Sequence, residues 1–135
     1  MHACEDGIGE TTRVLLVEDH TLFRQALSFL LYRHPHMEVM QAGTLAEARL
    51  LLGGVDVVAL DNYLPDGAGT DLIVEVRTNN PGASVLILND TPDSANRRSA
   101  LAAGADKVIS KVESPFTIVD EIKCLGDAPS ATSQH

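Results

Sequence analysis

Acidic side chains directly follow two apolar segments of the chain, and these are the residues whose types and spacing could do chemistry. Glu18 and Asp19 follow the segment 14–17, and Asp61 follows the segment 55–60. If both segments end at the same place, their carboxylates meet there, and like charges so close destabilise a fold unless they share a cation. Carboxylate oxygens with free positions for water suit Mg²⁺. The pattern therefore predicts a magnesium site.

Taken singly, each of these residues has a purely structural explanation. An aspartate at the end of a strand, such as Asp19, is usually the N-cap of the next helix. Asp61 opens a run of turn-forming residues that needs no function, and Lys111 could be an ordinary solvated lysine. Together, however, these residues would fill one crevice from three different strands, with a cation opposite the carboxylates. That combination favours a functional site.

Short apolar runs indicate the strands that must position these side chains. Unbroken, largely β-branched runs without polar alternation are typical of strands covered on both faces of a sheet. The five runs cover 14–17, 37–41, 55–60, 85–88 and 108–110.

The segments between those runs show helical spacing of apolar residues. Predicted helices cover 20–32, 44–52, 70–78 and 94–103, and a last helix begins at Ser114 and Pro115. Thr44 is the predicted N-cap of the second helix, with Glu47 completing a capping box. Strict alternation of strand and helix predicts a parallel sheet, because parallel neighbours need crossover connections.

The predicted fold class is α/β, a flavodoxin-like (βα)5 three-layer sandwich with a five-stranded parallel sheet in the order 2-1-3-4-5. The crevice of such a sheet lies beyond the carboxyl ends of the strands, between strands 1 and 3. Strand 4 ends in Asn89-Asp90 and strand 5 in Ser110-Lys111, so these residues face the same crevice. We expect one domain at 13–125, a flexible segment at 1–12, and at 126–135 a flexible tail or the start of a linker.

Charge and composition exclude several classes of protein. The net charge of −9 argues against an unassisted nucleic-acid binder, which needs a basic footprint. No apolar run is long enough to span a bilayer, and the first residues lack the apolar core of a signal peptide. Cys4 and Cys124 form no disulfide framework. We therefore expect a cytoplasmic protein with both thiols reduced.

Three segments resemble the receiver domain of two-component response regulators. They are Val-Leu-Leu-Val-Glu-Asp-His (14–20), Val-Val-Ala-Leu-Asp-Asn-Tyr-Leu-Pro-Asp-Gly-Ala-Gly (57–69) and Gly-Ala-Asp-Lys-Val-Ile-Ser-Lys (104–111). The Glu-Asp-His opening, the Leu-Pro-Asp-Gly turn and the Ala-Ala-Gly-Ala stretch are most similar to the branch with a LuxR-type helix-turn-helix output domain, the NarL/FixJ type. The resemblance covers residues 13–125.

The resemblance implies a role for each matching residue. Asp61 would be the phosphoacceptor, a carboxylate that takes a phosphoryl group from a kinase histidine. Asp19, Asp61 and the backbone carbonyl of Tyr63 would hold Mg²⁺, and Glu18 would act largely through bound water. Lys111 would pair with a phosphoryl oxygen after transfer.

The family also implies the partners. They are a sensor histidine kinase and, only through a C-terminal helix-turn-helix domain absent from this chain, DNA; a homodimer is compatible with the family, and no membrane is involved. The chain would be no enzyme beyond limited self-catalysed phosphotransfer and dephosphorylation. Transcription is the expected output. In the loop after the acceptor, Gly67 stands where a positive φ is needed.

Two positions depart from the family pattern. Strand 4 of a receiver normally ends in Thr or Ser, whose hydroxyl bonds the phosphoryl group; here Asn89 stands there, followed by the negatively charged Asp90. An amide donates a hydrogen bond but lacks the short reach of a hydroxyl. On strand 5, Val108 replaces an aromatic residue that swings inward on activation, and a β-branched aliphatic has no comparable pair of states.

These departures leave two interpretations. In the first, signalling is intact and small shifts of the fourth helix carry it. In the alternative, the chain is an atypical receiver that acts as a weakly switched or phosphorylation-independent interaction module. Enzymatic rivals are disfavoured: aspartyl phosphohydrolases place a second Asp where Tyr63 stands, and the Glu-Asp-His loop would repel the phosphate of a flavin.

Overall fold

The computed structural model describes residues 11–90 and 93–127. Its main sheet has parallel strands in the order β2-β1-β3-β6-β7. These strands are β1 (Thr12–Val17), β2 (Met37–Ala42), β3 (Val57–Asp61), β6 (Ser84–Asn89) and β7 (Lys107–Ser110). Counted along the chain, the order is 2-1-3-4-5, so the predicted flavodoxin-like topology is confirmed.

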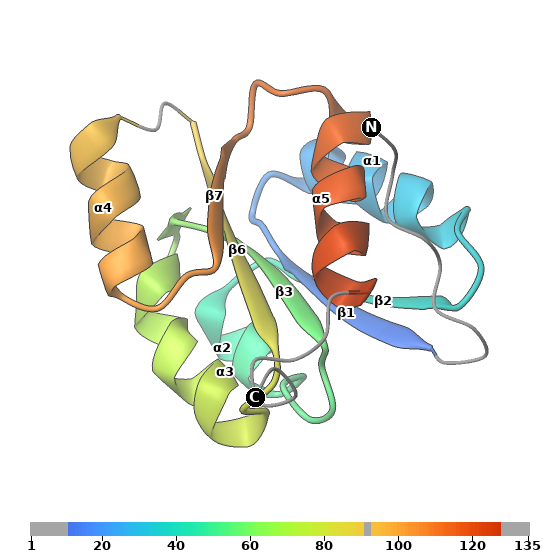
Figure 1. The fold of residues 1–135 in the computed structure, drawn as a ribbon, viewed down its shortest axis with the longest axis horizontal. Coiled ribbons are helices and arrows are strands. Elements are labelled where there is room, and N and C mark those ends of the chain that lie inside the picture. Colours follow the sequence, from blue (N-terminus) through green and yellow to red (C-terminus); the bar gives the residue numbers. More distant parts are fainter. Residues whose placement is uncertain (1–10, 91–92, 128–135) are drawn as a thin grey trace.

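Helices cover both faces of this sheet (Figure 1). One face carries α1 (Thr21–Tyr32) and α5 (Pro115–Asp127), and the other carries α2 (Leu45–Arg49), α3 (Ile73–Asn79) and α4 (Ser94–Ala102). Because successive side chains of a strand point to opposite faces, the side chains of β1 pack into two hydrophobic cores, one on each face of the sheet. Val14 and Leu16 pack in the core under α1 and α5, whereas Leu15 and Val17 pack in the core under α2, α3 and α4. The sheet is therefore held rigidly between two apolar layers.

Helix α2 begins as the sequence predicts, with one difference. The hydroxyl of Thr44 accepts the backbone N–H of Glu47 at 3.0 Å, so Thr44 is the N-cap. The predicted capping box is wrong in its second half, because Glu47 accepts the N–H of Gly43 at 2.6 Å, one residue before the cap. The Glu47 side chain therefore satisfies a backbone donor that precedes the helix, instead of the N–H of the N-cap residue Thr44.

Several element bounds differ from the prediction. Strand β1 includes Thr12, whose N–H donates to His36 at 2.7 Å, so the N-terminal segment predicted as flexible is ordered from that residue on. The predicted helix at 70–78 is a 3₁₀ turn, η1 (Gly69–Leu72), followed by α3. A hairpin of β4 (Tyr63–Leu64) and β5 (Gly67–Ala68) precedes it. Residues 1–10 and 128–135 of the predicted flexible ends lie outside the described residues.

The expectation of two reduced thiols is wrong. Cys124 is disulfide-bonded, whereas Cys4 lies outside the described residues. A pair of cysteines is too few for a disulfide framework, but that count does not exclude a single bridge. Over 11–90 and 93–127, no helix has the length and apolar character needed to cross a membrane.

Candidate functional site

Carboxylates from neighbouring strands meet at the carboxyl edge of the sheet. Glu18 and Asp19 follow β1, and Asp61 ends β3, which pairs with β1. One oxygen from each of the three carboxylates lies within 4.8 Å of the others. The sheet edge thus gathers these side chains as the sequence predicts, while their chemical roles remain predictions.

Asp19 is not the N-cap of α1, which is the simplest structural explanation for an aspartate at the end of a strand. The N-cap of α1 is His20, whose Nδ1 accepts the N–H of Phe23 at 3.3 Å. Asp19 is exposed and lines the cleft above the sheet edge. Its carboxylate therefore lies in the cleft and is available to a ligand there.

Glu18 is the deepest carboxylate of the site, with only 1% of its surface exposed. Its Oε2 accepts the N–H of His20 at 2.9 Å, and its backbone carbonyl accepts from Arg24 at 2.6 Å. Burial raises the pKa of the Glu18 carboxyl, although Lys111 and the His20 N–H act in the opposite direction. Burial therefore disfavours the charged form of Glu18, and the Lys111 ammonium and the His20 N–H offset part of that effect.

Lys111 supplies the opposing cation from the residue after β7. Its Nζ lies 2.9 Å from Glu18 Oε1, 3.3 Å from Asp61 Oδ2 and 3.7 Å from Asp90 Oδ1. Burial alone lowers the pKa of Lys111, but its contacts with Glu18 and Asp61 outweigh burial, so the pKa is raised. The lysine is therefore held as a cation, and its ammonium also lies 5.2 Å from the ring centre of Phe23.

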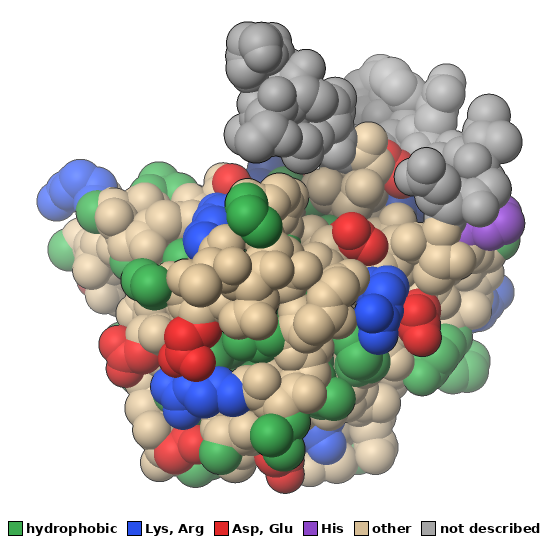
Figure 2. Space-filling model, turned by 90° about the horizontal axis from the view of Figure 1, so that it is seen from below, with side chains coloured by type: hydrophobic (Ala, Val, Ile, Leu, Met, Phe, Trp, Pro, Cys, Tyr) green, Lys and Arg blue, Asp and Glu red, His purple; other side chains and the backbone are tan. Residues whose placement is uncertain are grey.

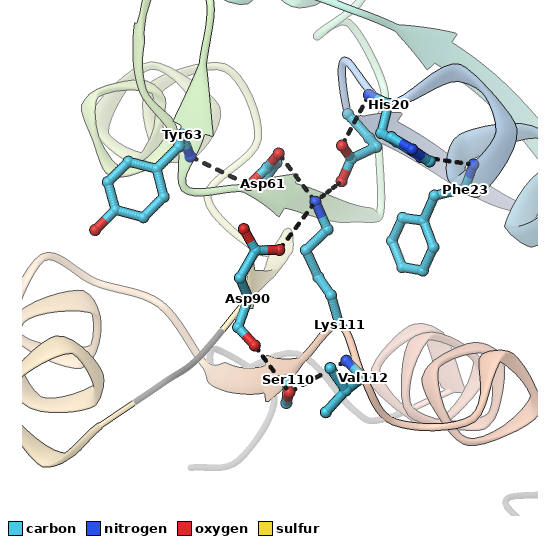
Figure 3. Close-up of polar contacts among 9 residues, drawn as sticks. His20, Phe23, Asp61, Tyr63, Asp90, Ser110, Lys111 and Val112 are labelled. Carbon is cyan, nitrogen blue, oxygen red and sulfur yellow. Dashed lines mark hydrogen bonds and ion pairs between the residues drawn. The ribbon is translucent and has the colours of Figure 1, made fainter.

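Asp61 lies at the floor of an open cleft of about 530 Å³. The carboxylate is buried; its Oδ1 accepts the N–H of Tyr63 at 3.1 Å, while Oδ2 faces Lys111. Figure 3 shows both contacts, with Asp90 approaching the ammonium from below in this view. The cleft is lined by Asp19, His20, Phe23, Asp61, Tyr63, Asp90, Lys111 and Val112. The Tyr63 N–H thus orients the Asp61 carboxylate through Oδ1, and the Lys111 ammonium offsets its negative charge at Oδ2.

The loop after Asp61 is fixed by contacts that the sequence does not reveal. Gly67 has a φ of +152°, in agreement with the predicted need for a positive φ. The carboxylate of Asp66 accepts the backbone N–H groups of Leu45 and Ala46 at 2.8 and 3.0 Å. The hydrogen bond from Leu45 lowers the pKa of Asp66. Because these donors begin α2, the loop is tied to the N-terminus of that helix.

The two residues that depart from the family pattern are both buried. Asn89 is 2% exposed, and neither polar atom of its amide has a hydrogen-bond partner among the described residues. Val108 is buried in the core under α2, α3 and α4. Its backbone carbonyl accepts from Arg97 of α4 at 2.9 Å. Neither Asn89 nor Val108 lines the cleft in this conformation.

Some of the cleft residues escaped the sequence reasoning. The prediction did not include the side chains of His20, Phe23 and Val112, which form the wall nearest α1 and α5. The position of His20 next to Glu18-Asp19 was a usable signal, since residues just past a strand line the same crevice. Phe23 and Val112 gave no signal: Phe23 fits the helical spacing of core residues, and exposed apolar residues such as Val112 are common in loops.

The opposite edge of the sheet has a different charge distribution. Figure 2 views the molecule from that side, where acidic and basic side chains lie interspersed. At the carboxyl edge, by contrast, the carboxylates of Glu18, Asp61 and Asp90 lie within 4 Å of the ammonium of Lys111, and a carboxylate oxygen of Asp19 lies within 4.8 Å of those of Glu18 and Asp61. The negative charge of the chain is therefore partly concentrated in one place, which calls for a ligand of positive charge.

Fold and site together define a class: a flavodoxin-like α/β domain whose switch-point crevice holds a cluster of carboxylates and one lysine. The family model described as the response regulator receiver domain matches residues 14–123. The chain belongs to that family, in agreement with the resemblance seen in its motifs.

Transcriptional regulators are among the known proteins similar to the chain. It is 32% identical to the probable transcriptional regulatory protein TcrX of Mycobacterium tuberculosis, over 84% of this chain and 48% of that protein. It is also 32% identical to the DNA-binding transcriptional activator DevR/DosR of the same organism, over 84% of this chain and 54% of that protein. The chain thus spans about half the length of these curated relatives.

Solved structures are similar over most of the chain. A two-component response regulator of the LuxR family from Aurantimonas sp. SI85-9A1 superposes with a TM-score of 0.77. The two share 29% sequence identity, and the match covers 86% of this chain and 85% of that one. A LuxR-family regulator among the similar structures agrees with the predicted branch.

Proposed function

We propose that this domain accepts a phosphoryl group from a sensor histidine kinase on Asp61. The observation that carries the proposal is the setting of Asp61: a buried carboxylate at the floor of an open cleft, with Lys111 3.3 Å from one oxygen. A nucleophile must be reachable by its substrate, and its position must be fixed before reaction. Asp61 meets both requirements.

The residues present fit a magnesium ion. Oxygen donors are the ligands that Mg²⁺ prefers, and three carboxylates offer oxygens within 4.8 Å of one another while sharing one ammonium. Asp19, Asp61 and the backbone carbonyl of Tyr63 would hold the ion, with Glu18 acting through water. Bound there, Mg²⁺ neutralises charge on the phosphoryl oxygens during transfer.

The transfer itself needs little acid or base chemistry. One carboxylate oxygen of Asp61 bonds to phosphorus while the bond from phosphorus to the donor's nitrogen breaks, and the imidazole leaves with that electron pair. The Tyr63 N–H orients the attacking carboxylate through Oδ1. The acyl phosphate no longer carries the aspartate charge, so the ammonium of Lys111 turns to a phosphoryl oxygen.

Labelling by a small phosphodonor tests the proposal. With acetyl phosphate and Mg²⁺, the chain is expected to gain the mass of one phosphoryl group, and with EDTA it is expected to gain none. Because the chain has no tryptophan, metal binding is best followed by amide NMR, with shifts expected next to Glu18, Asp19 and Asp61. Absence of both labelling and metal-induced shifts would instead support a phosphorylation-independent interaction module.

A specific observation favours weak coupling between phosphate and output. Asn89 and Val108 replace the residues that move in other receivers, and Arg97 ties α4 to the carbonyl of Val108. A modification shifts two states only through its differential contacts with them. We infer that Val108 offers no second state comparable to the movement of an aromatic ring.

Amide spectra with and without beryllofluoride measure that coupling. The expected result is a set of shifts confined to the cleft, around Asp61 and Lys111, with α4 and β7 nearly unchanged. Large shifts across α4 and β7 would contradict weak coupling and would restore the interpretation that this receiver switches normally.

The wider biological role is a second part of the proposal. We propose that the receiver domain spans 13–125, acts in the cytoplasm, and controls transcription through a DNA-binding domain outside this chain. Its sequence similarity to transcriptional regulators, of which it spans about half, supports that output. Homodimer formation belongs to the same proposal. Its chemistry is limited to accepting and losing the phosphoryl group.

A further inference from the structure

Asp90 adds a carboxylate to the rim of the cleft, beside Glu18, Asp19 and Asp61 of the site. It directly follows β6, its side chain is 77% exposed, and its Oδ1 lies 3.7 Å from Lys111 Nζ. Figure 3 shows Asp90 and Asp61 on different sides of the ammonium. Among the described residues, this ion pair is the one polar contact of the Asp90 carboxylate. The Asp90 carboxylate therefore contributes to the charge of the cleft more than to the stability of the fold.

We propose that Asp90 is a charge-selectivity residue, which slows phosphoryl transfer to Asp61 in proportion to the negative charge of the donor. The inference rests on the proposed phosphoacceptor function. Asp90 lines the same cleft as Asp61, so a donor that reaches the acceptor passes close to this exposed carboxylate. Like charges a few ångströms apart repel even in water.

Competition for Lys111 acts in the same direction. The ammonium is shared by Glu18, Asp61 and Asp90, at 2.9, 3.3 and 3.7 Å. The incoming phosphoryl oxygens need this cation when the bond from Asp61 to phosphorus forms and the donor leaves with the electron pair of the broken bond. A carboxylate that holds the ammonium at the rim weakens that contact.

Two small donors of different charge separate this effect from a structural one. Acetyl phosphate is a dianion at neutral pH, whereas phosphoramidate is a monoanion. In saturating Mg²⁺, Asp90→Asn and Asp90→Ala are expected to raise the rate constant of labelling about fivefold with acetyl phosphate and about twofold with phosphoramidate. The gain is expected to shrink as salt is added, because the carboxylate is exposed.

The matched control removes one negative charge elsewhere. Asp120 is an exposed aspartate of α5 that does not line this cleft, and Asp120→Asn is expected to label at the wild-type rate with both donors. Equal gains with both donors, or no gain in either Asp90 variant while the wild type is labelled, would overturn the role of Asp90 alone. A wild-type chain that neither donor labels would overturn the proposed function and this inference with it.

Discussion

Asp61→Asn is expected to reduce labelling by acetyl phosphate in Mg²⁺ at least a hundredfold, to the background level. An amide is a poor nucleophile and cannot form the acyl phosphate, so the step is lost, not slowed. The substitution keeps the shape of the side chain and an oxygen that accepts the N–H of Tyr63. Quantitative intact-mass spectrometry of the wild type and the variant measures the effect, and Asp61→Ala is expected to give the same result.

The folded state of the variant provides the control. Asp61 shares Lys111 with Glu18, so its neutralisation leaves the ammonium with a carboxylate partner, and the variant is expected to remain folded by circular dichroism. Asp120→Asn, at an exposed position outside the cleft, is expected to be labelled like the wild type. Persistent labelling of a folded Asp61→Asn variant would refute the assignment of the acceptor.

The strand pattern and the order of the sheet were predictable because they depend on local composition and on general rules of chain connection. The apolar run at 85–88, for example, becomes the centre of β6, and its side chains serve both cores. The small hairpin at Tyr63–Leu64 and Gly67–Ala68 was not predictable, because two-residue strands leave no periodic signal. Strand β3 likewise begins at Val57, since Val55 is buried without joining the ladder.

For the site, the sequence predicted which carboxylates meet and that Lys111 lies opposite them, and both are confirmed. It did not predict which carboxylate oxygens the ammonium contacts. Glu18 follows β1 and Asp61 ends the neighbouring parallel strand β3, so their convergence follows from the sheet. The sharing of Lys111 with Asp90 depends on the path of the loop after β7, which no local pattern encodes. The bond from Arg97 to Val108 is similarly a long-range contact, visible only once α4 is placed on β7.

A steric constraint on the backbone at Gly69 was likewise not predictable from the sequence. The sequence directed attention to Gly67, whose positive φ is confirmed, but the tighter constraint is at Gly69. There an added Cβ would overlap the carbonyl oxygen of Asp61 and would approach Leu60 Cγ to 3.0 Å. The N–H of Gly69 donates to Asn62 at 3.0 Å, which holds this turn against the end of β3.

Gly69→Ala is therefore expected to lower the free energy of unfolding by about 3 kcal/mol, because backbone atoms must move to admit the methyl group. Urea denaturation of both proteins measures the change. Gly53→Ala is the matched control: nothing lies within 4 Å of the added Cβ there, and the expected change is zero or a small gain from reduced freedom of the unfolded chain. Equal stabilities of the two variants would contradict the close contact. Because the nearest of the displaced atoms is the backbone oxygen of Asp61, the Gly69 variant is also expected to label more slowly than the Gly53 variant in Mg²⁺ and acetyl phosphate. That result would link the packing of Gly69 to the placement of Asp61.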